Sequence, residues 1–146
     1  GTLRKDEQQL VSLADELQHL RLYLDIEKVR FGHRLQTAIE VQDEAMNMRL
    51  PGLLLQPVVE NAIKFGLYGT LGETEIGIKA IAEDHHLLIH IRNPYDPESV
   101  RPQQGTGFGL NSIRRRLYLL YARQDLLSTR QEENIFATTI KIPQKL

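Results

Sequence analysis

Hydrophobic periodicity switches several times along this chain of 146 residues, and the order of the switches limits the folds open to it. Residues 35–41 alternate apolar and polar side chains, which is typical of a strand with one buried face. Apolar residues at helical spacing precede this strand and return between residues 51 and 66. The same patterns predict strands around residues 76–80, 87–91, 126–130 and 135–142, with a helix over residues 109–122.

This order of helix, strand, helix, two strands, helix and two strands predicts an α+β fold. We expect a two-layer α/β sandwich in which helices cover one face of a mixed sheet. Residues 94–104 contain three prolines among polar neighbours and are predicted to form a loop.

The chain is predicted to open with a helix over residues 1–31, ended by Gly32. Its leucines at positions 10, 13, 17, 20 and 24 make a narrow stripe at helical spacing. From Leu22 the apolar surface widens through Ile26 and Val29, as expected where a helix packs onto a core. We interpret residues 1–31 as a helical linker that continues an upstream segment, and residues 32–146 as the folded domain.

Composition excludes several classes of function. The formal net charge of −1 argues against a nucleic-acid binder that works by neutralising phosphates. The chain has no cysteine, so disulfides and thiolate metal sites are excluded. No apolar run approaches the ~18 residues of a transmembrane helix. A cytoplasmic location fits, as does one domain of a larger membrane protein.

The first motif with candidate chemistry runs from Glu60 to Gly66 on the second helix. Asn61 and Lys64 are three residues apart and share a face, which Phe65 extends with an aromatic ring. An amide oxygen suits Mg²⁺, an ammonium suits phosphate, and the Glu60 carboxylate is a candidate general base. The alternative is that Glu60 and Lys64 form a surface ion pair.

The second motif is the glycine-rich segment Gly105-Thr106-Gly107-Phe108-Gly109-Leu110, which leads into the third helix. Glycines let a ligand approach the backbone closely, and the free N–H groups at a helix start attract anions. The segment therefore predicts a phosphate site, although a flexible loop closing onto a helix start would look the same.

At these positions the chain resembles the ATP-binding catalytic domain of sensor histidine kinases, within the GHKL superfamily and its Bergerat fold. Residues 55–64 (LQPVVENAIK) are similar to the N box, and residues 105–111 (GTGFGLN) to the G2 box that ends the ATP lid. Residues 23–32 (YLDIEKVRFG) resemble the stretch before the catalytic domain in LytS-like kinases. The similarity spans almost the whole chain.

The resemblance implies ATP and Mg²⁺ as cofactors. It implies that Asn61 coordinates Mg²⁺, Glu60 acts as the acid/base carboxylate, Lys64 contacts phosphate and Phe65 flanks the nucleotide. The phosphates would be held by the glycine-rich segment: Gly105, Thr106, Gly107, Phe108, Gly109 and Leu110. The expected reaction moves the γ-phosphate to a histidine on an upstream dimerisation segment outside this chain, and then to an aspartate of a response regulator.

One motif departs from the family pattern. Where the family usually has an aspartate that accepts from the adenine amino group, followed by asparagine and glycine, this chain has Asn93-Pro94-Tyr95. The Asn93 carbonyl can accept from the same amino group, and Asp96 is a second candidate acceptor. Because the family's charge and glycine are missing, a degenerate nucleotide sensor or pseudokinase stays open. A gyrase- or Hsp90-like ATPase is a third reading.

Several partners follow from the resemblance. We expect the upstream dimerisation helices to form a homodimer in the full-length protein, and a response regulator to receive the phosphoryl group. The expected location is a cytoplasmic domain of a membrane-anchored sensor, attached through N-terminal segments outside this chain. His19 is not expected to be the phosphoacceptor, and His85, His86 and His90 are expected to be solvated rather than to bind a metal.

Overall fold

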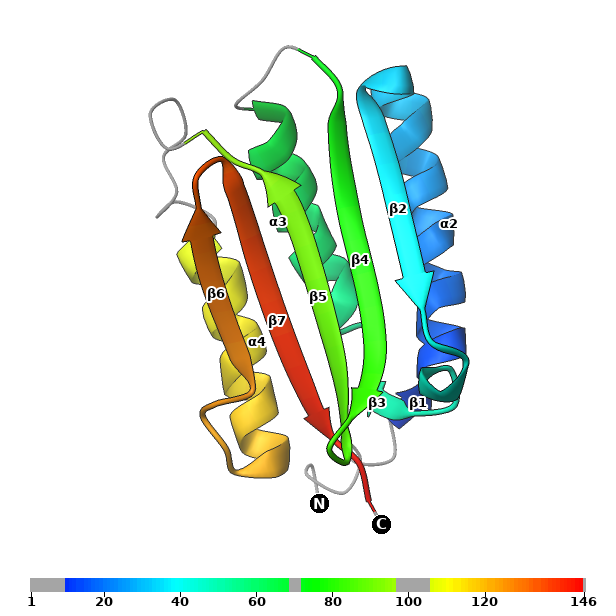
Figure 1. The fold of residues 1–146 in the computed structure, drawn as a ribbon, viewed down its shortest axis with the longest axis vertical. Coiled ribbons are helices and arrows are strands. Elements are labelled where there is room, and N and C mark those ends of the chain that lie inside the picture. The colour runs from blue at the N-terminus through cyan, green and yellow to red at the C-terminus, as the bar shows by residue number, and fades with distance from the viewer. Residues whose placement is uncertain (1–9, 69–71, 97–105, 146) are drawn as a thin grey trace.

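The computed structural model describes residues 10–68, 72–96 and 106–145, in which three α-helices lie on one face of a five-stranded sheet (Figure 1). The helices are α2 (Leu13–Phe31), α3 (Leu55–Tyr68) and α4 (Thr106–Tyr121). The strands are β1 (Leu10–Ser12), β2 (Leu35–Val41), β3 (Arg49–Pro51), β4 (Thr74–Glu83), β5 (His86–Pro94), β6 (Leu127–Glu132) and β7 (Ile135–Pro143). Short 3₁₀ turns occupy Gly32–Arg34 and Asp43–Ala45.

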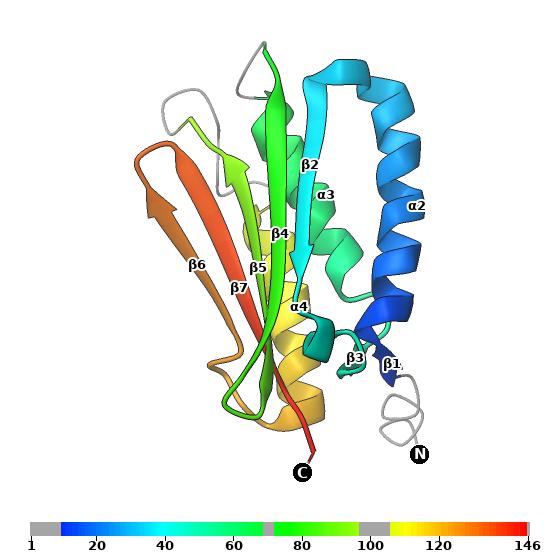
Figure 2. The ribbon, with the colours of Figure 1, turned by 45° about the vertical axis from the view of Figure 1, so that its right-hand side comes forward.

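The five strands lie in the order β2-β4-β5-β7-β6. β2 and β4 are parallel because α3 lies between them in the chain, whereas the other neighbours are antiparallel. Turned by 45°, the molecule shows all three helices on the same side of this sheet (Figure 2). The predicted two-layer sandwich with a mixed sheet is therefore confirmed.

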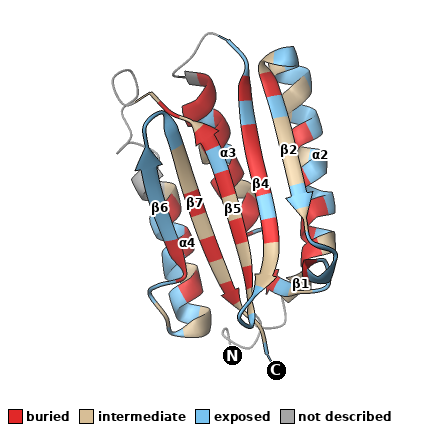
Figure 3. Cartoon of the chain, viewed as in Figure 1, coloured by how far each residue is buried: buried red, intermediate tan, exposed pale blue. Residues whose placement is uncertain are grey.

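The core lies between the two layers. Alternate side chains of β4, β5 and β7 are buried, which is why the strands are banded when coloured by burial (Figure 3). On β5 the buried side chains include Leu87, Ile89 and Ile91, each at most 1% exposed. This spacing of two places the asparagine at position 93 on the same inner face.

The first helix begins later than its leucine pattern predicts. Leu10 belongs to β1, which pairs with β3 in a small antiparallel sheet, and α2 begins only at Leu13. The hydroxyl of Ser12 accepts a hydrogen bond from the backbone N–H of Asp15 (3.1 Å) and caps the helix. Gly32 ends the helix as predicted, with φ +63° and its N–H donating to the carbonyl of Lys28.

The buried face of α2 is the leucine stripe, and the expected second apolar face is exposed. Leu13, Leu17, Leu20 and Leu24 are at most 2% exposed and contact the core. By contrast Leu22, Ile26 and Val29 are 61%, 67% and 87% exposed, so the expectation that they pack onto the core is wrong. The boundary between residues 31 and 32, and the continuation upstream, stay predictions. No helix in the described ranges is long and apolar enough to cross a membrane.

Candidate functional site

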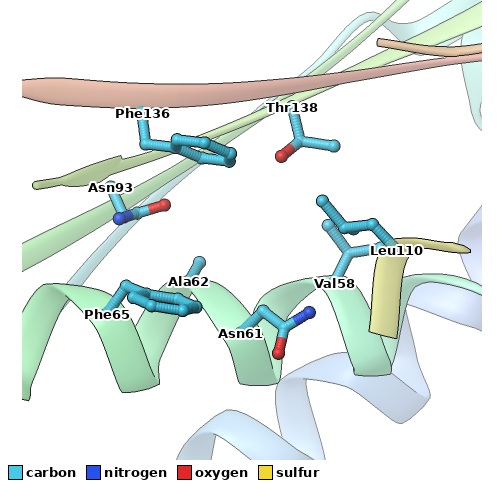
Figure 4. Close-up of a pocket in the computed structure, with 8 residues that line it drawn as sticks. All are labelled: Val58, Asn61, Ala62, Phe65, Asn93, Leu110, Phe136 and Thr138. Atoms are coloured by element: carbon cyan, nitrogen blue, oxygen red, sulfur yellow. The ribbon is translucent and has the colours of Figure 1, made fainter. Parts of the chain in front are cut away.

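A small cavity lies where α3, β5, β7 and the start of α4 meet (Figure 4). It is lined by Val58, Asn61, Ala62, Phe65, Asn93, Leu110, Phe136 and Thr138. Its volume is about 10 Å³, roughly the room that one water molecule needs.

The Asn61 side chain carries an unsatisfied amide at this cavity. Its Nδ2 atom is buried and has no hydrogen-bond partner in the described part of the chain. Gly109, in the first turns of α4, lies directly against it, since a Cβ built on this glycine would be only 2.7 Å from Nδ2. Among the described residues, Asn61 Nδ2 is thus a buried donor without an acceptor, at the place where α4 approaches α3.

The Asn93 side chain on β5 is 3% exposed and is partnered. Its Nδ2 donates to the carbonyl oxygen of Pro94 at 2.7 Å. That carbonyl can only accept, so the atom facing it must be the amide NH₂ and the other atom must be the acceptor Oδ1. Figure 4 shows this oxygen pointing toward the cavity. The site therefore presents a hydrogen-bond acceptor at position 93.

The segment after Asn93 stays joined to the sheet. The N–H of Tyr95 donates to the carbonyl of Asn134 (2.7 Å), and the Tyr95 ring lies 5.8 Å from that of Phe136. Asp96 is half-buried but does not line the cavity. Asn93 is therefore the better placed of the two predicted acceptors.

Glu60 and Lys64 are exposed on α3 and do not line the cavity. Glu60 faces α2 closely enough to affect Tyr23, whose pKa is raised by burial first and then by the carboxylates of Glu27 and Glu60. The structure thus places the predicted metal-binding amide at the cavity and the predicted acid/base carboxylate on the outer surface. Phe65 is 9% exposed and lines the cavity, and its contact with a nucleotide stays a prediction.

The glycine-rich segment is helical where the structure describes it. Thr106, Gly107 and Phe108 open α4, and Gly109 and Leu110 continue it, so the helix begins at residue 106 and not at the predicted residue 109. Leu110 is 3% exposed and lines the cavity. Gly105 and residues 97–104 of the predicted loop lie outside the described residues, as do the side chains at positions 106–108.

Sequence reasoning missed four lining residues: Val58, Ala62, Phe136 and Thr138. Thr138 is the informative one, because it is a polar residue only 4% exposed on the inner face of β7. The signal was a threonine at a core position of an alternating strand. The sequence did not indicate that Thr138 lines the same cavity as Asn61, because this depends on the pairing of β7 with β5.

The histidines take no part in this site. The Nε2 atom of His19 lies 3.0 Å from Oε1 of Gln56, and His86 and His90 contact different neighbours. The described residues contain no cluster of three or more histidine, aspartate and glutamate side chains suited to a metal ion.

Three comparisons with known proteins point to one family. Residues 1–35 match the model of the histidine kinase family. Sensor histidine kinase BtsS of Escherichia coli strain K12 is 39% identical over 112 residues, which are 75% of this chain and 19% of BtsS. Sensor protein LytS of Enterococcus faecalis is 27% identical over 135 residues, 85% of this chain and 23% of LytS.

Among solved structures, the catalytic domain of histidine kinase ThkA superposes with a TM-score of 0.68 at 16% identity, covering 92% of this chain and 94% of that domain. The architecture is therefore that of a histidine kinase catalytic domain. The chain belongs to the sensor histidine kinases, and it spans about a fifth of the length of the curated relatives named above.

Proposed function

We propose that this chain is the ATP-binding catalytic domain of a two-component sensor kinase. It would bind Mg²⁺-ATP and pass the γ-phosphoryl group to a histidine on an upstream dimerisation segment, from which a response regulator aspartate receives it. The observation that carries the proposal is the buried Nδ2 of Asn61, which lies against Gly109 and has no hydrogen-bond partner among the described residues. A buried donor that lacks an acceptor is what a phosphate oxygen would satisfy.

The residues at the cavity fit a magnesium nucleotide. Asn61 can donate to a phosphate through Nδ2 and offer Oδ1 to Mg²⁺, which prefers oxygen ligands. Lys64, exposed one turn along α3, can contact phosphate as a point charge. The start of α4 adds backbone N–H groups and the positive end of a helix dipole. When bound, Mg²⁺-ATP supplies the phosphoryl group and the metal charge that offsets it.

The position of Glu60 fits a role outside the cavity. Its carboxylate is exposed, so it can accept a proton from an imidazole that approaches from solvent. Asn93 Oδ1 can accept from the amino group of adenine, whereas guanine offers an acceptor there. We therefore expect binding of ATP to exceed binding of GTP. ThkA has been solved in complex with the response regulator TrrA, which supports a regulator as partner here.

Calorimetry with ATP and a non-hydrolysable analogue, with and without Mg²⁺, tests the nucleotide site. We expect magnesium-dependent binding with a dissociation constant below about 1 mM. Asn61→Ala should remove the magnesium dependence, whereas Asn47→Ala, at an exposed asparagine outside the cavity, should not. No binding at millimolar ligand would contradict the proposed site.

A nucleotide sensor or pseudokinase is the second candidate, favoured by the asparagine at position 93, where the family resemblance leads us to expect an aspartate. The two candidates differ in chemistry. A longer chain that includes the upstream segment should form phosphohistidine from ATP if the domain is a kinase. Nucleotide binding without phosphohistidine would favour the sensor, and rapid hydrolysis without it would favour a gyrase- or Hsp90-like ATPase.

A further inference from the structure

A buried carboxylate on α2 holds the beginning of α3. Glu16 is only 4% exposed, which is rare for a glutamate without a partner. Its Oε1 accepts from the N–H of Leu53 (2.9 Å), and its Oε2 accepts from those of Leu54 (2.8 Å) and Leu55 (3.1 Å). One side chain therefore satisfies three consecutive backbone donors.

Two of these donors belong to the start of α3, where Leu55 is the first helical residue and Leu54 directly precedes it, and the third, Leu53, lies in the turn before the helix. A helix leaves its first N–H groups without intrahelical partners, and a serine, threonine, aspartate or asparagine usually caps them. Here α3 is preceded by Gly52, Leu53 and Leu54, none of which has a capping side chain. Glu16 supplies the cap from another helix, and its charge suits the positive end of the α3 dipole.

The turn that Glu16 holds has a strained backbone. Leu53 has φ +60°, a conformation that favours glycine, and its side chain is 58% exposed. Such a residue persists only where its surroundings fix it, and the bond from Leu53 N–H to Glu16 is one such constraint.

The same turn is also held from α4. A guanidinium nitrogen of Arg116 donates to the carbonyl of Gly52 at 2.8 Å. The start of α4 lies against Asn61 through Gly109. The turn 52–55 thus joins the three helices, and two of these carry the residues of the candidate site.

We propose that Glu16 is a positioning residue for the nucleotide site: its carboxylate fixes where α3 begins and so sets the place of Asn61 at the cavity. Asn61 lies about 9 Å along the helix axis from Leu55, near enough that a tilt or an unwound turn at the start reaches it. This inference rests on the proposed function and names no contact between Glu16 and the nucleotide.

Glu16→Gln tests the inference in the whole chain. Glutamine keeps the shape but turns one acceptor into an NH₂ donor, so it cannot accept from all three amides. Hydrogen exchange at the amides of residues 53–55 should become about tenfold faster, while exchange in β5 stays unchanged. The ratio of the ATP dissociation constants without and with Mg²⁺ should fall by about tenfold, because Asn61 is displaced.

Leu17→Ala is the matched control. Leu17 is the next residue of α2, is 2% exposed in the core, and makes no polar contact with the turn, so this variant loses stability without losing the cap. When both proteins are folded, it should leave the magnesium ratio, which is the ratio of the ATP dissociation constants without and with Mg²⁺, as in the wild type. A Glu16→Gln protein that keeps the wild-type ratio, or unchanged exchange at residues 53–55, would overturn the proposal.

A second variant keeps the test decisive if Glu16→Gln folds poorly. Adding Leu53→Gly gives the turn a residue that adopts positive φ freely. The double variant should recover the magnesium ratio if Glu16 acts by holding this turn, and a ratio as low as in Glu16→Gln, or lower, would contradict that route.

If the wild type binds no nucleotide, the proposed function fails, and the positioning role is then tested by the NMR signals of Asn61. The side-chain NH₂ resonances of Asn61 should then shift in Glu16→Gln and not in Leu17→Ala. Resonances that are unchanged in both variants would overturn the positioning role as well.

Discussion

Replacing Asn61 and Asn93 by leucine should change the stability of the ligand-free domain in opposite directions. The two asparagines line the same cavity, and leucine has the same number of side-chain heavy atoms with the same branching. Their hydrogen bonds differ: Nδ2 of Asn61 has no partner among the described residues, whereas Nδ2 of Asn93 donates to Pro94. Each substitution removes a side-chain amide. Whether that amide has a hydrogen-bond partner therefore decides whether the substitution lowers or raises the stability of the domain.

The magnitudes follow from that difference. A buried donor without a partner costs about 1–3 kcal/mol, and Asn61→Leu removes this penalty. Asn93→Leu removes a hydrogen bond in a buried setting and should cost about 1–3 kcal/mol. In a domain of this size about 1 kcal/mol shifts the melting temperature by about 4 °C. The two variants should thus differ by roughly 8–24 °C, with the wild type between them.

Urea denaturation and thermal melting without nucleotide measure both changes. Asn47→Leu, at an exposed asparagine, serves as the control and should leave the free energy of unfolding unchanged. If Asn61→Leu is neutral or destabilising, a water molecule or another group satisfies Nδ2 and the reasoning fails. If it stabilises the domain, it should also abolish magnesium-dependent ATP binding, because the same amide is retained for function at a cost in stability.

Two further variants test packing and protonation. Gly66→Ala would place a methyl 2.6 Å from Cγ2 of Thr74 and should cost about 1–3 kcal/mol. Thr74→Ser in that background should recover most of the lost stability, because serine lacks the methyl group but keeps the hydroxyl that donates to the Gly66 carbonyl (2.9 Å). Additive effects of the two substitutions in a double-mutant cycle would refute the clash. For His90, burial first and then Lys79 lower its pKa from the ordinary 6.5, so the unfolded state binds more protons. Stability should be full above pH 6.5 and fall as the pH drops through the folded-state pKa. His90→Gln should flatten this loss in urea denaturation at several pH values, and a variant as pH-sensitive as the wild type would contradict it.

Local periodicity was sufficient to predict most elements of the fold. The strand at residues 35–41 and the helix ended by Gly32 follow from patterns within a few residues. The beginning of α2 did not follow, because Leu10 pairs with Pro51, and a pairing across forty residues of sequence leaves no local pattern. The exposure of Leu22 and Val29 was missed for the same reason, since it depends on which side of α2 meets the sheet.

The site was predictable where a motif lies on one element. Asn61, Phe65 and Leu110 were expected from the resemblance, and the structure brings them to one cavity. Thr138 joins them only through the register of β7 beside β5. Glu16 left a signal that sequence reasoning did not use, namely an acidic residue on the buried side of a leucine stripe. A carboxylate at such a position requires a partner, but the sequence does not say which backbone supplies it.

The departure at position 93 has a physical explanation in the ligand-free structure. Asn93 donates to the Pro94 carbonyl, a bond that an ionised aspartate cannot make because it has no donor. An aspartate there would also be a buried charge facing a carbonyl oxygen, which is costly. Asparagine therefore stabilises this ligand-free arrangement relative to the aspartate that the family resemblance leads us to expect. If nucleotide binds only molecules in which the bond from Asn93 to Pro94 is broken, its apparent affinity falls in proportion to the fraction of such molecules. A nucleotide that accepts a hydrogen bond from Nδ2 of Asn61 regains part of that free energy on binding. By this reasoning Asn93 weakens nucleotide binding, whereas Asn61 strengthens it.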